Sequence, residues 1–206
     1  MTQIDGRIYL ASRSPRRREL LKQIGVTYEL MLLRENPQRG ADVKETPLPD
    51  EAPVAYVTRI AQIKAESGWR IVMKRRIPQY PVLAADTTVV IDNEILGKPE
   101  DAQHAQRMLR RLSGHTHQVL TAVAVACNDQ VATVLSTSAV EFRELTDDEI
   151  RRYVVGGEPL DKAGAYAIQG RAAVFARRIT GSYSGIMGLP LFETAELLRN
   201  HDVTPL

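Results

Sequence analysis

The segment from Leu10 to Leu21 constrains the fold more than any other part of the chain. Apolar residues up to Ala11 predict a short buried strand, and Pro15 stands where a helix begins, with Ser14 as its N-cap. The apolar residues near Leu21 give this helix one side that can pack against a core. The chain is therefore expected to run from a strand directly into a helix N-terminus.

Such a junction presents free backbone N–H groups at the positive end of a helix dipole, which is a favourable place for an anion. Four arginines and two serine hydroxyls surround it: Arg13, Arg16, Arg17, Arg18, Ser12 and Ser14. This set favours a multiply charged phosphate over a single carboxylate. A capped surface helix with solvated arginines is the alternative.

Composition narrows the class of protein. The 206 residues suffice for one sizeable domain or two closely packed lobes, and the net charge of +2 requires any polyanion-binding function to be local. Cys127 is the single cysteine and lies in an apolar run, which excludes an internal disulfide and predicts a packed thiol in a reducing compartment. No apolar run approaches the ~20 residues that span a membrane, and the N-terminus lacks a signal-peptide pattern. We expect a cytoplasmic protein.

Strands alternate with helices along the chain, which predicts an α/β domain over residues 1–206 with no interdomain linker. We expect strands at 28–33, 82–91, 117–126, 131–142 and 175–179, and helices from Asp50 or Glu51, over 101–112, after Thr146 and from Pro190. The long hairpin over 117–142 predicts a mixed sheet. Residues 34–51 are expected to form an exposed loop, 158–170 a turn with a short strand, and 181–188 a glycine-rich turn. Val54 and Phe192 are expected to face the core.

Asp86 interrupts the most apolar of these segments. A carboxylate in such a run must be solvated, paired or bound to a metal, because an unpartnered buried charge is costly. A hairpin turn at Asp92 returns the chain, so that Lys98 is expected near Asp86. These two charges predict either a structural ion pair or a site for metal and phosphate.

Two other groups of residues give weaker predictions. His115 and His117 lack a third metal ligand at a recognisable spacing, so we interpret them as strand-edge histidines. The basic run 74–76 ends a predicted helix, where it complements the helix dipole. No interleaved aromatic residues support a nucleic-acid surface there.

Several sequence blocks, in one order and over nearly the whole chain, resemble the Maf family of nucleoside triphosphate pyrophosphatases. The blocks are residues 10–17 and 19–21, Ala85–Val89, Gly97–Pro99, residues 112–114 with His117, Asp161–Tyr166, Ile168–Gly170 and Gly188–Leu191. The Asp-Lys-Ala-Gly and Ile-Gln-Gly blocks are similar to the branch that acts on dTTP and UTP.

The resemblance implies an α/β fold like that of inosine triphosphate pyrophosphatases: a mixed twisted sheet with flanking helices, and two lobes around a cleft. It implies cleavage between the α and β phosphates of dTTP, UTP or modified pyrimidine nucleotides, giving the monophosphate and pyrophosphate. It also implies a divalent cation, Mg²⁺ or Mn²⁺, and a homodimer, with no membrane or specific nucleic acid as partner.

The resemblance also implies residue roles. Asp86 would accept a proton from the attacking water or hold the metal, and Lys64 and Lys98 would neutralise charge on the leaving pyrophosphate. Ser12, Ser14 and Arg16 would hold the triphosphate, while Thr87, Arg16 and Gln169 match positions that distinguish substrates. The amide of Gln169 can both donate and accept, which suits the O4/N3 edge of thymine and uracil.

The chain departs from the family pattern before the second helix. Members usually carry two acidic residues there, but this chain has Lys44 followed by Glu45, in a loop that is longer before residue 42. Glu45 is the remaining candidate metal ligand. A rival interpretation, also from the family, is a nucleotide- or nucleic-acid-binding regulator of septum formation and cell division without turnover. Asp86, Lys64 and Lys98 favour the enzyme, because binding alone requires only the phosphate loop.

Overall fold

The computed structural model describes residues 6–34 and 42–206, so residues 35–41 of the predicted loop lie outside it. The strands are β1 Arg7–Leu10, β2 Thr27–Leu30, β3 Val82–Ile91, β4 Glu94–Leu96, β5 Thr116–Cys127, β6 Gln130–Phe142 and β7 Ala176–Thr180. The α-helices are α1 Pro15–Gln23, α2 Pro53–Arg75, α3 Ala102–Leu112, α4 Asp147–Val155, α5 Tyr183–Met187 and α6 Leu191–Arg199, and the 3₁₀ turns are η2 Glu158–Asp161, η3 Ala163–Ala165 and η4 Arg171–Phe175.

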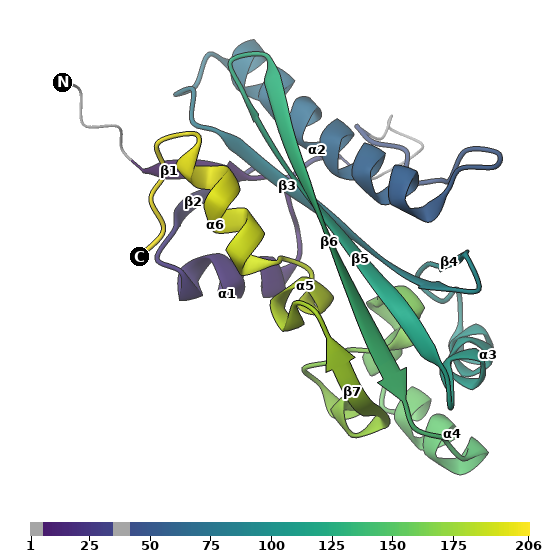
Figure 1. The fold of residues 1–206 in the computed structure, drawn as a ribbon. Coiled ribbons are helices and arrows are strands. Elements are labelled where there is room, and N and C mark those ends of the chain that lie inside the picture. Colours follow the sequence, from purple (N-terminus) through teal and green to yellow (C-terminus); the bar gives the residue numbers. More distant parts are fainter. Residues whose placement is uncertain (1–5, 35–41) are drawn as a thin grey trace.

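The described strands form one seven-stranded sheet in the order β2-β1-β3-β5-β6-β7, with β4 on β3. Strand β1 is parallel to β2 and β3, and the other pairings are antiparallel. The predicted mixed sheet is therefore confirmed. The β5–β6 hairpin turns at Asn128 and Asp129, which both have positive φ, and it runs the length of the molecule (Figure 1).

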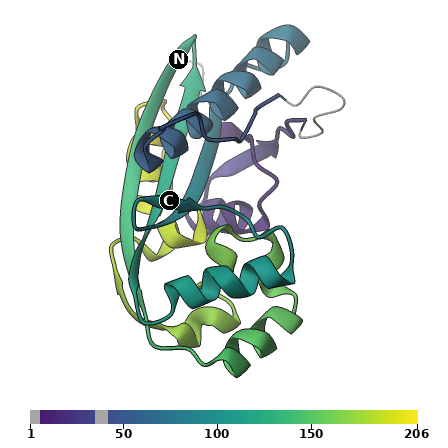
Figure 2. The same cartoon turned by 90° about the vertical axis from the view of Figure 1, so that its right-hand side faces the viewer.

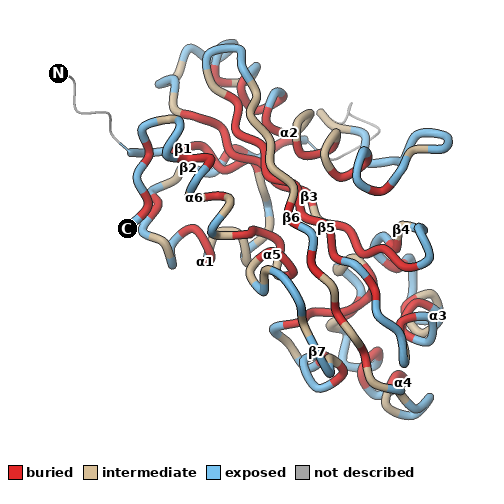
Figure 3. Tube along the Cα trace, in the orientation of Figure 1, coloured by how far each residue is buried: buried red, intermediate tan, exposed pale blue. Residues whose placement is uncertain are grey.

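Helices cover both faces of the sheet and one end of it. Helix α2 packs against β3 and β5 on one face, and α1 and α6 lie on the other (Figure 1). Helices α3 and α4 gather with the short 3₁₀ turns at the far end of the hairpin (Figure 2). Buried positions follow the inner strands continuously (Figure 3), and the core has one cluster under α2, one under α1 and α6, and a third around α3 and α4. This is the two-lobed α/β architecture expected from the sequence.

Most helix starts confirm the sequence prediction. Ser14 caps α1, Asp101 caps α3, and Thr146 forms a capping box with Glu149 at α4. Helix α2 is the exception, because its N-cap is Ala52. The Glu51 carboxylate instead accepts a hydrogen bond from Arg59 Nε at 2.6 Å.

The expected core positions of Val54 and Phe192 are wrong, since they are 48% and 76% exposed. Val54 lies in the first turn of α2, where Pro53, Tyr56 and Val57 are the buried residues, and its side chain falls outside that buried side of the helix. The buried side of α6 is centred on Leu197 and Leu198, and Phe192 lies about 120° around the helix from Leu198.

The expected strand within 158–170 is also wrong, because η2 and η3 occupy this segment. Gly164 has φ +67°, and a Cβ at this position would lie 2.8–2.9 Å from Val89 side-chain carbons. Its N–H donates to the Gly97 carbonyl at 3.0 Å. The turn can therefore pack directly on β3 only with glycine here.

Two smaller predictions need correction. Residues 183–187 form α5 rather than a turn, because Ser182 Oγ accepts a hydrogen bond from Gly185 N. The strand predicted over residues 28–33 is β2, which ends at Leu30 instead of Leu33. Cys127 is partly buried at the end of β5 and packs against the α2 cluster, and burial raises the pKa of its thiol.

His117 is not a strand-edge histidine, because β5 lies between β3 and β6. Its ring is buried against Phe142 and Tyr166, with Nε2 at 2.8 Å from the Tyr166 hydroxyl. Burial lowers the pKa of His117 to about 4. The imidazole is therefore neutral at pH 7 and serves packing. None of the described helices has the length and apolarity needed to cross a membrane.

Candidate active site

A cleft of about 590 Å³ opens beside the middle of β3. Strand β1 pairs with β3 only at Val82 and Leu83, and β4 pairs with it from Val89 onward. Residues 84–88 therefore have no described neighbouring strand along this edge. Side chains alternate between the two faces of a strand, so the gap lets Asp86 from one face and Thr87 from the other line the same cleft.

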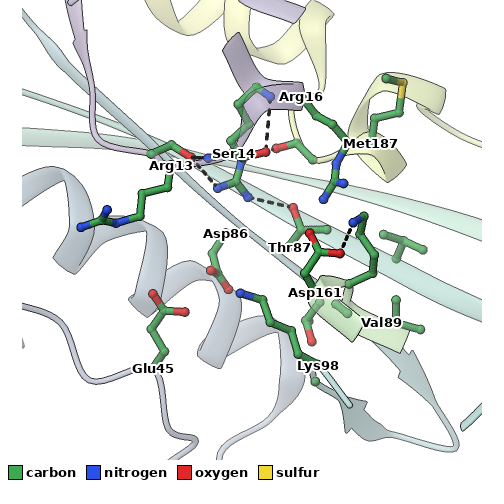
Figure 4. A pocket seen from close by; sticks show the side chains of 18 of the residues that line it. Arg13, Ser14, Arg16, Glu45, Asp86, Thr87, Val89, Lys98, Asp161 and Met187 are labelled. Carbon is green, nitrogen blue, oxygen red and sulfur yellow. Dashed lines mark hydrogen bonds and ion pairs between the residues drawn. The ribbon is translucent and has the colours of Figure 1, made fainter. Parts of the chain in front are cut away.

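On the α2 face, Lys64 joins two carboxylates. Its Nζ lies 2.8 Å from Asp86 Oδ1 and 2.9 Å from Glu45 Oε1. The side chains of Lys64 and Asp86 are 14% and 11% exposed, while that of Glu45 is 46% exposed. Asp86 is thus paired, which is one of the three outcomes that the sequence left open, but its partner is Lys64 rather than Lys98. Lys98 is exposed and its side chain points toward Asp86 from the β4 side (Figure 4).

Burial raises the pKa of the Asp86 carboxyl, and the cations of Lys64 and Arg17 oppose this shift. A buried carboxylate held between a lysine and an open cleft has the environment typical of a catalytic base. Tyr56 supports the neighbouring loop, because its hydroxyl donates to the Glu45 carbonyl at 3.1 Å. Burial and the two carboxylates raise the pKa of Tyr56 to about 12, so it remains a neutral donor.

On the opposite face, the strand-to-helix junction forms a network of hydroxyls and an arginine. Ser12 Oγ accepts hydrogen bonds from Ser14 N at 3.2 Å and from Arg17 Nη1 at 3.3 Å. Ser14 Oγ accepts from Arg17 N at 3.5 Å. Both serine hydroxyls use lone pairs in these contacts, so each can still donate its proton to an anion. Arg16 also lines the cleft, and its guanidinium has no ion-pair or hydrogen-bond partner in the part of the chain described.

Sequence reasoning did not separate Arg17 from the other arginines. Its Nε donates to the Gly188 carbonyl at 2.8 Å and its Nη2 to Thr87 Oγ1 at 3.2 Å. Burial lowers the pKa of Arg17, while the negative charge of Asp86 opposes the shift. The helical spacing could have indicated that Arg17 faces inward. It lies three residues before Leu20 and four before Leu21, so it is on the same side of α1 as these buried leucines.

The third wall of the cleft comes from the 3₁₀ region. Gln169 is exposed, and among the residues described none hydrogen-bonds its side chain, so both amide groups remain available. Lys162 forms an ion pair with Asp161, and both line the cleft (Figure 4). All the residues predicted from the sequence line this one cleft: Ser12, Ser14, Arg16, Glu45, Lys64, Asp86, Thr87, Lys98 and Gln169.

The donor set suits a hard divalent cation shared with a ligand. Within residues 6–34 and 42–206 no group of three or more His, Cys, Asp or Glu could hold a metal by itself. However, the carboxylates of Asp86 and Glu45 converge on one point, now taken by Lys64 Nζ. Mg²⁺ is commonly bound by one or two carboxylates together with substrate phosphates. Lys44 is exposed and is not among the residues that line the cleft.

The fold and the cleft define an α/β protein that can bind a multiply charged anion beside a buried carboxylate. The chain belongs to the Maf family, since the model of the family described as Maf-like protein matches residues 7–201.

Curated relatives match over nearly their whole length. Proteins named dTTP/UTP pyrophosphatase from Nitrosomonas europaea and Nitrosospira multiformis are 56% and 58% identical, covering 96% and 97% of this chain and 95% and 96% of theirs. One from Dechloromonas aromatica is 54% identical and covers 97% of this chain and 100% of its own. Among solved structures, the Staphylococcus aureus Ham1 protein matches 95% of this chain and 99% of its own with a TM-score of 0.50 at 16% identity, a likeness of fold alone.

Proposed function

We propose that this chain is a nucleoside triphosphate pyrophosphatase that hydrolyses dTTP and UTP, or modified pyrimidine nucleotides, to the monophosphate and pyrophosphate. One observation carries the proposal: a buried carboxylate paired with lysine faces an arginine–hydroxyl anion site across a single cleft. The names of the relatives support the same reaction and the same nucleotides.

The junction of β1 and α1 would hold the triphosphate. Arg16 supplies a guanidinium that pairs with no described residue, and Ser12 and Ser14 supply hydroxyl protons, while the dipole of α1 favours negative charge at the same point. Arg17 donates a hydrogen bond to the Gly188 carbonyl, so it would fix the shape of the β1–α1 junction. Its positive charge would also attract the triphosphate, without direct contact.

Asp86 would take the proton of the water that attacks the phosphoanhydride. Its carboxylate lines the cleft, and burial makes it a stronger base than an exposed aspartate. Lys64 and Lys98 would stabilise the negative charge that develops on the leaving pyrophosphate. Lys64 also orients the Asp86 carboxylate before substrate arrives.

A divalent cation, Mg²⁺ or Mn²⁺, fits beside Asp86 and Glu45 together with the phosphates of the substrate. When bound, it would supply charge neutralisation and polarisation of a phosphoryl oxygen. Glu45 is exposed, and the Tyr56 hydroxyl anchors its backbone, so its side chain can exchange Lys64 for another cation without moving the loop.

The direct test is pyrophosphate release from dTTP, UTP, CTP, ATP and GTP with Mg²⁺ or Mn²⁺. We expect turnover of dTTP and UTP to exceed that of the purine nucleotides, and a chelator to abolish it. Tight nucleotide binding without pyrophosphate release under any of these conditions would instead support the regulator without turnover.

Arg16→Ala tests the phosphate site. We expect kcat/KM to fall about 10- to 150-fold for every nucleotide, because a charged hydrogen bond of this kind contributes about 1.5–3 kcal/mol and does not depend on the base. Steady-state kinetics on five nucleotides measure the effect, and a loss confined to one base would make Arg16 a base reader.

Gln169→Glu tests the choice of base. A carboxylate cannot donate a hydrogen bond, so the variant should lose about tenfold more kcat/KM on dTTP and UTP than on purine nucleotides with an N–H donor at the paired edge. Equal losses on all nucleotides would show that Gln169 supports the backbone or the phosphates and would leave the pyrimidine preference without this basis.

Three remaining expectations belong with this proposal. We infer that the enzyme works in the cytoplasm, where its proposed substrates are made, as a single catalytic domain over residues 1–206. The homodimer expected from the resemblance stays a prediction, which light scattering on a sizing column tests.

A further inference from the structure

Lys64 stands between the two carboxylates to which the proposed function assigns the divalent cation. Its Nζ lies 2.8 Å from Asp86 Oδ1 and 2.9 Å from Glu45 Oε1, and these two acidic side chains point toward each other (Figure 4). An ammonium has three donor hydrogens. Two of them serve the carboxylates, and the third has no partner among the residues described. Lys64 therefore places its own positive charge where the two acidic groups meet.

The free protein offers this ammonium no other place. Lys64 and Asp86 are both mostly buried, so water screens their ion pair only weakly. Among the described residues of the cleft, the one further carboxylate is that of Asp161, which is already paired with Lys162. A divalent cation that used the same oxygens would have to break both contacts of Lys64 and would then meet an unpaired like charge beside it.

The rest of the cleft also disfavours a bare cation. Of the described residues that line it, seven are lysine or arginine and three are aspartate or glutamate. A cleft lined mainly by one sign of charge attracts ions of the opposite sign. A nucleoside triphosphate keeps a net negative charge after it has bound one divalent cation. The cleft therefore attracts the complex of metal and nucleotide, whereas it repels the metal alone.

A bound triphosphate would supply the partner that Lys64 lacks in the free protein. The four-carbon stem of lysine is flexible, so Nζ can turn from the carboxylates toward a phosphate while α2 stays in place. The β1–α1 junction, which would hold the phosphates, lines the same cleft as Lys64. When phosphate oxygens accept hydrogen bonds from the ammonium, Asp86 and Glu45 become available to the cation that the nucleotide carries.

We propose that Lys64 closes the metal site of the free protein, so that the divalent cation enters only as its complex with the nucleoside triphosphate. This inference rests on the proposed function and deepens it, because it names the metal–nucleotide complex as the form of the substrate that the site accepts. Lys64 thus selects the complex against the bare cation, in addition to its part in neutralising the leaving group.

Binding of Mn²⁺ alone, followed by the loss of the free-ion signal in electron paramagnetic resonance, tests the closed site without nucleotide or turnover. We expect the wild type and Glu45→Gln to bind Mn²⁺ equally weakly, because the Glu45 carboxylate is not available to the metal in either protein. This comparison needs no change at Lys64. Tight binding of Mn²⁺ by the wild type that Glu45→Gln or Asp86→Asn weakened would overturn the proposal.

Lys64→Met removes the charge and keeps the length of the side chain. We expect the affinity for Mn²⁺ to rise at least about tenfold, because the metal no longer has to break charged hydrogen bonds, each of which contributes at least about this factor. Lys64→Arg keeps the charge and should bind Mn²⁺ as weakly as the wild type. Adding Glu45→Gln to Lys64→Met should remove the gain, which would locate it at this site. An unchanged affinity in Lys64→Met, with its fold checked by the thermal midpoint, would contradict the proposal.

Lys98→Met is the matched control. Lys98 lines the same cleft, but the ion pairs of Asp86 and Glu45 are with Lys64. Its replacement removes the same charge, and we expect the affinity for Mn²⁺ to stay close to that of the wild type. A gain as large as that of Lys64→Met would show general repulsion by the cleft instead of a closed site, and would refute the proposal. Failure of the wild type to release pyrophosphate would refute the proposed function without deciding these affinities, which are measured in the absence of nucleotide.

Discussion

Asp86→Asn is expected to lower the rate of pyrophosphate release from UTP by at least about 100-fold, the scale of a general base. The amide has nearly the same shape, but it cannot take the proton of the attacking water and is a poor ligand for a divalent cation. Burial raises the pKa of Asp86, so the wild-type carboxylate is a better base than a solvated one. Single-turnover and steady-state kinetics at saturating metal measure the loss.

The fold should survive this change. Lys64 retains its ion pair with Glu45 at 2.9 Å when Asp86 becomes neutral, so no buried charge is left without a partner. The thermal midpoint of Asp86→Asn, compared with that of the wild type, checks this. A correctly folded variant that turned over UTP within a few-fold of the wild-type rate would remove Asp86 from the catalytic role.

Local patterns predicted the elements and most of the cleft. The apolar run and Pro15 located the strand-to-helix junction, and helical spacing placed Lys64 on the side of α2 that faces the core. Apolar runs bounded by turn residues predicted β3 and the hairpin, and the turns after β3 and within the hairpin carry positive-φ Asn and Asp residues. These features depend on neighbours in the sequence, which is why one chain suffices to predict them.

The pairing inside the cleft depends on how distant elements meet. Asp86 was expected near Lys98, which is twelve residues away through a hairpin, but α2 crosses β3 so that Lys64 reaches it first. The gap along β3 arises because β1 ends at Leu10, opposite Leu83, while β4 ends at Leu96, opposite Val89, and no local pattern encodes that coincidence.

His117 provides the second large effect, on stability at acid pH. Its pKa is about 4 in the folded protein, because burial opposes the charged form, against 6.5 in an unfolded chain. Between these values the unfolded state binds more protons, so folding stability is full above pH 6.5, falls as the pH is lowered, and levels off below pH 4. The separation corresponds to about 3 kcal/mol.

His117→Gln isolates this contribution. Glutamine can still hydrogen-bond the Tyr166 hydroxyl, yet it does not titrate. As the pH is lowered from 6.5 to 4, the unfolding free energy of the wild type should therefore fall by about 3 kcal/mol more than that of the variant. Urea unfolding at a series of pH values measures this difference in unfolding free energy. The titration of carboxylates, which are the same in both proteins, contributes equally to both and cancels in the difference. Parallel stability curves would show that His117 titrates normally. Because Tyr166 belongs to the segment that carries Gln169, the same protonation is expected to loosen this wall of the cleft before the molecule unfolds.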